Sequence, residues 1–127
     1  MAQGKGGAVT GVPAHPRVPS YTTFEAPVGY RIERTLGLCW GITVRSRDVI
    51  GTTMAGLRTI LGGEINELSE LAEHARAQAL ERMESNAIQM GANAILGMRF
   101  DSTEIMQSTN EIIAYGTAVV VVPIEKQ

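Results

Sequence analysis

The sequence predicts an α+β domain of two layers, in which two helices cover an antiparallel sheet of about three strands in the order β-α-α-β-β. Three observations predict this class. An amphipathic helical pattern spans about 66–90, β-forming residues dominate 30–44, and two more strand-like runs follow at 94–100 and 112–122. With 127 residues, of which 44% are hydrophobic and 19% charged, the chain fits one folded domain.

Residues 1–20 differ in composition from the rest of the chain. They have no periodic apolar pattern and are interrupted by Gly4, Gly6, Gly7, Gly11, Pro13, Pro16 and Pro19. Such a stretch cannot recover the entropy lost on ordering. We therefore expect a flexible tail over 1–20 and the α+β domain over 21–127.

The first strand and the first helix follow the tail. Residues 30–44 alternate in part and are broken at Gly37 and Gly41, which predicts extended structure with a bend or bulge at the glycines. Further on, apolar residues recur at helical spacing and end at a pair of glycines: Ile50, Met54, Leu57, Leu61 and then Gly62-Gly63. This pattern predicts a first amphipathic helix, although Gly51 and Gly56 within it disfavour the helix.

The second helix has the strongest pattern in the sequence. From about Asn66 to Met90, one face carries Leu68, Leu71, Ala72, Ala75, Ala79, Met83 and Met90. The opposite face carries Glu70, Glu73, His74, Glu81 and Glu84. Gly91 is placed to end this helix, and the polar stretch 107–110 indicates a hairpin between the last two strands.

The last strand predicts association between copies of the chain. Residues 117–123 read Thr-Ala-Val-Val-Val-Val-Pro, so the strand is apolar on both faces. One helical layer covers only one face of a sheet, and an exposed apolar face or edge favours association. We therefore expect a homo-oligomer.

Charge and composition exclude several classes of partner. The net charge is −2 and the isoelectric point is near 5.7, which is the wrong sign for binding phosphate backbones, so we expect no nucleic acid partner. No apolar run approaches the length of a membrane span, and residues 1–11 lack the apolar core of a signal peptide, so we expect no membrane partner. A single cysteine suits a reducing compartment, and we expect a cytoplasmic protein.

Metal ligands are few. Glu70 and His74 stand four residues apart on the second helix and could share an ion, and Cys39 is the single thiol. We interpret Glu70 and His74 as part of a solvated or salt-bridged helix face. We interpret Cys39 as a small buried thiol. Cys39 also has no base or orienting group in a recognisable pattern, so we expect neither an enzyme nor a bound cofactor.

A second cluster lies on the strands. Arg99 and Asp101 alternate onto one strand face, where a cross-strand ion pair is the default reading. The alternative is a polar pocket between subunits in which Arg99 pairs with a ligand carboxylate. Trp40 packs in a core or interface, or stacks on a planar ligand at such a seam.

Short motifs run in order through almost the whole domain. They are Gly37-x-x-x-Gly41-x-x-Val44, Val44-Arg-Ser-Arg47, Ala55-Gly-Leu-Arg-Thr-Ile-Leu-Gly-Gly63, Ala75-Arg76, Gly91-Ala-Asn-Ala-Ile-Leu-Gly97 and Gly116-Thr-Ala-Val119. Together they resemble the YbjQ-like family of small uncharacterised bacterial proteins, sometimes labelled "putative heavy-metal-binding". The resemblance implies a dodecin-like subunit in a pentameric ring that pairs into larger particles, and it implies no established activity.

These readings lead to one expectation and one alternative. We expect a non-enzymatic homo-oligomer, a pentamer by the family resemblance, that acts as a scaffold or binding protein. The alternative is a module that binds a metal or small ligand at subunit interfaces. Its candidate residues are Trp40, Arg99 and Asp101 for a ligand, and His74, Glu70 and Cys39 for a metal.

Overall fold

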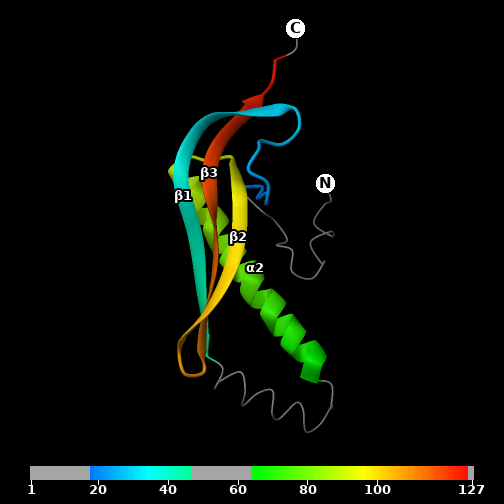
Figure 1. Ribbon diagram of the computed structural model, residues 1–127, viewed down its shortest axis with the longest axis vertical. Coiled ribbons are helices and arrows are strands. Elements are labelled where there is room, and N and C mark those ends of the chain that lie inside the picture. Colours follow the sequence, from blue (N-terminus) through cyan, green and yellow to red (C-terminus); the bar gives the residue numbers. More distant parts are fainter. Residues whose placement is uncertain (1–17, 47–63, 126–127) are drawn as a thin grey trace.

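Three long strands and one helix form the part of the chain that the computed structural model describes, residues 18–46 and 64–125 (Figure 1). They are β1 (Tyr30–Ser46), α2 (Glu64–Met90), β2 (Ala94–Met106) and β3 (Thr109–Pro123). The strands form one antiparallel sheet in the order β1-β3-β2, so the last strand lies in the middle. No helix in these ranges is long and apolar enough to cross a membrane.

The prediction of two helices is wrong. The described residues contain a single helix and give the order β-α-β-β, while the first expected helix falls within 47–63, outside the described residues. That expectation rested on four apolar residues in a segment interrupted by Gly51 and Gly56, each of which costs about 1 kcal/mol in a helix. The three-stranded antiparallel sheet and the long helix that ends at Met90 agree with the sequence analysis.

Small residues let α2 lie close to the sheet. Its buried stripe repeats every fourth residue and consists of Ala75, Ala79, Met83 and Ala87. Facing it, Gly41 leaves no room for a side chain, because a Cβ there would overlap the backbone of Ala79 and Met83. The buried stripe is narrower than expected, since Leu71 and Met90 are each 37% exposed.

The segment before β1 belongs to the fold. Val18 is 2% exposed within the core, and the Tyr21 amide donates to the Ile95 carbonyl at 2.8 Å, so the ordered domain includes residues placed in the expected tail. The Ser20 hydroxyl donates to Glu84 Oε2 at 3.3 Å, and Glu84, expected on the exposed acidic face of the helix, is 3% exposed. Residues 1–17 lie outside the described residues.

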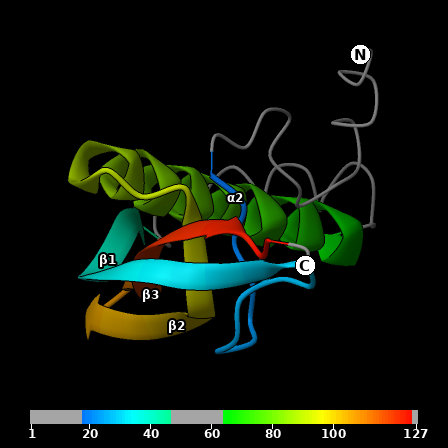
Figure 2. The same cartoon turned by 90° about the horizontal axis from the view of Figure 1, so that it is seen from above.

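The two faces of the sheet are covered differently. α2 covers one face, and the segment 18–29 passes from the helix side to the opposite side (Figure 2). There, Tyr21 and Ala26 pack on Val119 and Val121, which are buried by their own chain. We call the face opposite α2 the open face, because this segment covers only one end of it.

Candidate functional site

Alternation along β1 determines which side chains reach the open face. Cys39 and Thr43 are each 2% exposed toward α2. The neighbouring Leu38, Trp40 and Val44 are 61%, 47% and 51% exposed on the other side. The open face therefore carries large apolar side chains in contact with solvent.

The strand register brings the sequence-predicted ligand residues onto this face. Trp40 on β1 and Arg99 on β2 lie on either side of Tyr115, which belongs to the central strand β3. Two residue pairs further on, and therefore on the same face, Asp101 lies opposite Ile113. Trp40, Arg99 and Asp101 thus share one region, as the alternation within β2 indicates for the last two.

A groove lies at the centre of this region. It has a volume of about 420 Å³ and is lined by Leu38, Trp40, Asp101, Ile113 and Tyr115. We call it the open-face groove. The sequence analysis singled out neither Ile113 nor Tyr115, because only the pairing of β3 between the two other strands places them beside Trp40 and Asp101.

Asp101 and Tyr115 are hydrogen-bonded to each other at the groove, whose surface is almost entirely apolar. The Tyr115 hydroxyl donates to Asp101 Oδ2 at 3.0 Å. This hydrogen bond, with smaller effects of desolvation and of the Asp101 charge, raises the pKa of Tyr115 above its ordinary value of 10.0, while Arg99 lowers it. The phenol therefore remains a donor at neutral pH.

The Arg99 guanidinium is bound by backbone carbonyls in this structure. Its Nη1 donates to the carbonyls of Thr22 at 3.0 Å and Met98 at 2.8 Å. The guanidinium also lies 5.5 Å from the ring centroid of Phe24. Arg99 is absent from the groove lining, although its charge is close enough to Tyr115 to lower the pKa of that residue.

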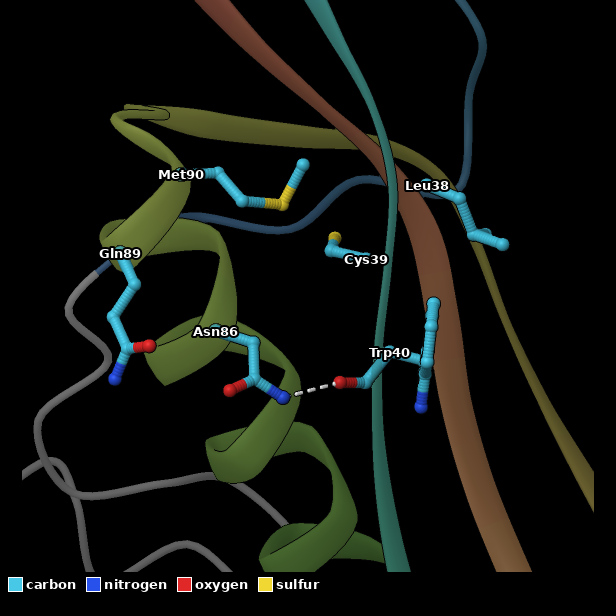
Figure 3. A pocket seen from close by; sticks show the side chains of 6 residues that line it. All are labelled: Leu38, Cys39, Trp40, Asn86, Gln89 and Met90. Carbon is cyan, nitrogen blue, oxygen red and sulfur yellow. Dashed lines mark hydrogen bonds between the residues drawn. The ribbon is translucent and has the colours of Figure 1, made fainter.

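A second cavity, of about 460 Å³, lies between the outer edge of β1 and the end of α2. Figure 3 shows its lining: Leu38, Cys39, Trp40, Asn86, Gln89 and Met90. Leu38 and Trp40 point away from the helix, whereas Cys39 lies on the helix side. Asn86 Nδ2 donates to the Trp40 carbonyl at 2.7 Å, and Arg82 Nη1 donates to the Ile42 carbonyl at 2.7 Å.

Comparison with known proteins gives a consistent family match. Residues 20–122 match a family model described as "Putative heavy-metal-binding". A UPF0145 protein of Solibacter usitatus is 51% identical over 105 residues, covering 83% of this chain and 93% of the relative. UPF0145 proteins of Bradyrhizobium and Saccharolobus islandicus are 54% and 57% identical, covering 80% and 77% of this chain and 91% and 86% of theirs.

A solved structure is similar in fold. The crystal structure of a protein of unknown function from Pediococcus pentosaceus, assigned to the DUF74 family, matches with a TM-score of 0.54. The match covers 83% of this chain and 98% of the other at 12% sequence identity. At this identity the similarity concerns the fold alone.

The description of the family model raises the question of a metal site. The Cys39 thiol donates to the Gly116 carbonyl at 3.6 Å, and burial raises its pKa above 9.0. A soft metal requires the thiolate, which this environment disfavours. Glu70 and His74 are exposed on α2, and the described ranges contain no group of three or more His, Cys, Asp or Glu side chains that could hold a metal ion. These donors do not fit a heavy-metal centre.

Proposed function

The chain belongs to the YbjQ-like family of uncharacterised proteins, and from this premise we propose that it is a non-enzymatic protein that assembles with copies of itself over the open face. The proposed assembly is a pentamer, which the family resemblance supports, and such rings can pair. The proposed location is the cytoplasm, which the free thiol of Cys39 supports. The net charge of −2 argues against a nucleic acid partner.

The exposed apolar side chains of the open face carry this proposal. Leu38, Trp40 and Val44 share this face of β1 and are 61%, 47% and 51% exposed. Contiguous apolar surface of this kind marks interaction sites in soluble proteins. A second copy would remove this surface from water.

The absence of a catalytic role is part of the proposal. The buried Cys39 is held as a thiol, which is a poor nucleophile, and its hydrogen bond goes to a backbone carbonyl. Arg99, two residues before Asp101 on β2, is engaged by two backbone carbonyls. Both arrangements favour packing and binding over group transfer.

Two matched valines test the assembly. Val44 is half-exposed on the open face, whereas Val28 is fully exposed in the loop before β1. We expect native mass spectrometry of the unmodified chain to give five times 13.6 kDa. Val44→Glu should lower the subunit number and Val28→Glu should leave it unchanged, because a charge in an apolar contact costs several kcal/mol. A monomer at micromolar concentration, or equal effects of both variants, would contradict the proposal.

The alternative function is a module that binds a small ligand or a metal at subunit interfaces. The open-face groove favours the small ligand, because its volume falls within the range of ligand pockets. If copies meet over the open face, this groove lies at their seam. Elemental analysis of the purified protein tests the metal: stoichiometric zinc or copper that is lost in Cys39→Ser or His74→Ala would establish the metal function.

A further inference from the structure

The open-face groove combines an apolar wall with one charge. Leu38 and Ile113 provide aliphatic surface, and Trp40 and Tyr115 provide aromatic rings. Asp101 is the charged residue of the lining. The rings would therefore bind a flat apolar ligand, and Asp101 would determine which sign of charge on that ligand is favoured.

Tyr115 is the hydrogen-bond partner of the Asp101 carboxylate, and the charge of Arg99 reaches this pair only far enough to lower the pKa of Tyr115. The neighbouring cation, Arg99, donates to the carbonyls of Thr22 and Met98 and lies against Phe24. Tyr115 donates one neutral hydrogen bond to Asp101 Oδ2, which orients the carboxylate without cancelling its charge. An anionic ligand would be repelled here, in contrast to the carboxylate ligand that Arg99 indicated in the sequence.

We propose that the open-face groove binds a planar organic cation, with its flat body against Trp40 and Tyr115 and its positive charge beside Asp101. Aromatic rings attract cations through their negative faces, and the carboxylate adds a direct charge interaction. The inference rests on the proposed function only in using the same face. In an assembly, the groove would lie between copies, where partial exclusion of water strengthens both interactions.

Trp40 provides a reporter for the test, because it is the single tryptophan of the chain. N-methylquinolinium serves as the cationic probe, quinoline at neutral pH as its uncharged counterpart, and naphthalene-2-sulfonate as the anionic one. Each is titrated into the full chain by calorimetry, with quenching of Trp40 emission as the second readout. We expect the cation to bind about fivefold to tenfold more tightly than quinoline and the anion to bind most weakly.

Asp101→Asn removes the charge of this side chain while keeping its shape, so it tests the contribution of the charge to binding. It should lower the affinity for N-methylquinolinium about fivefold to tenfold and leave that for quinoline unchanged. Trp40→Leu should lower the affinity for both probes. The loss should be larger for the cation, about fivefold. Glu70→Gln removes the same charge from the exposed surface of α2 and should change neither affinity. Equal affinities for the three probes, no detectable binding, or an unchanged preference in Asp101→Asn would overturn the inference.

Native masses measured on the same samples keep the two proposals apart. If the chain assembles and shows no Asp101-dependent preference for the cation, the groove inference fails and the assembly stands. If the chain is a monomer and the preference persists, the assembly fails and the groove inference stands.

Discussion

The two faces of the sheet are built from the same strands, but one is buried against α2 and the other is largely exposed to solvent. On the α2 face, Met83, Ala114 and Ala118 are fully buried. On the open face, Leu38 and Trp40 of β1 are 61% and 47% exposed. Along β1 the larger apolar side chains lie on the open face, whereas the α2 face carries Cys39, Gly41 and Thr43, so hydrophobicity alone does not decide which face receives the helix.

Side-chain size distinguishes the faces. Gly41, Ala79 and Ala87 bring the backbones of β1 and α2 together, whereas the open face presents Leu38, Trp40 and Tyr115. A helix approaches closely only where small residues remove the obstacle, and bulky residues leave grooves between them. In this chain, small residues allow the close contact between β1 and α2, and large residues line the candidate groove.

The largest expected effect comes from filling the closest approach on the α2 face. Gly41→Val should cost about 4 kcal/mol or more, because its side chain meets backbone atoms of α2 that cannot move independently. Chemical denaturation measures the loss. Gly37→Ala is the control: no atom lies within 4 Å of the added methyl group, and its φ of 121° leaves only backbone strain of about 1 kcal/mol. Equal losses would mean that helix packing does not depend on Gly41.

The second prediction compares truncations on the two faces. Met83→Ala should lower the free energy of unfolding by about 3 kcal/mol, because Met83 is 0% exposed and leaves a cavity. Leu38→Ala should cost about 0.5 kcal/mol in the isolated subunit. A Leu38→Ala cost that grows with protein concentration would show that a second copy covers the open face. Similar costs at every concentration would remove the distinction between the faces.

The smallest effect concerns the pH dependence of stability. Burial raises the folded-state pKa of Cys39 above 9.0, so the fold favours the thiol. This contribution is fully present below the pKa of the unfolded thiol and is lost as pH rises through the folded-state pKa. Between about pH 8 and about pH 10, the unmodified chain should therefore lose more stability than Cys39→Ala. Denaturation curves at the two pH values test this, and parallel losses in both proteins would contradict it.

Local patterns predicted the elements that local interactions determine. The long amphipathic pattern and Gly91 located the end of α2 at Met90, and Gly37 lies at a register shift of β1 with φ of 121°. The extension of β2 to Met106 was missed because its final residues are exposed, so no burial pattern marks them. Pairing with β3 keeps this part extended, and the two strands are joined at Gln107 and Ser108.

Long-range contacts explain why the site was only partly predicted. Strand alternation placed Arg99 and Asp101 on one face, and the structure agrees. The Arg99 guanidinium nevertheless donates to the Thr22 carbonyl, 77 residues away in sequence, a partner that no spacing rule identifies. Tyr115 joins the groove only because β3 lies between β1 and β2, and the sequence pattern does not specify this strand order.

The hydrogen bonds from α2 to the edge of β1 affect how the sheet can grow. Asn86 and Arg82 occupy the outward carbonyls of Trp40 and Ile42, and Pro19 and Tyr21 pair with Ile95 on the opposite edge. An additional strand at either place would first have to displace these native bonds. Edge-to-edge pairing of sheets, the first step toward fibrils, is therefore opposed at two positions, one by α2 and one by the segment before β1.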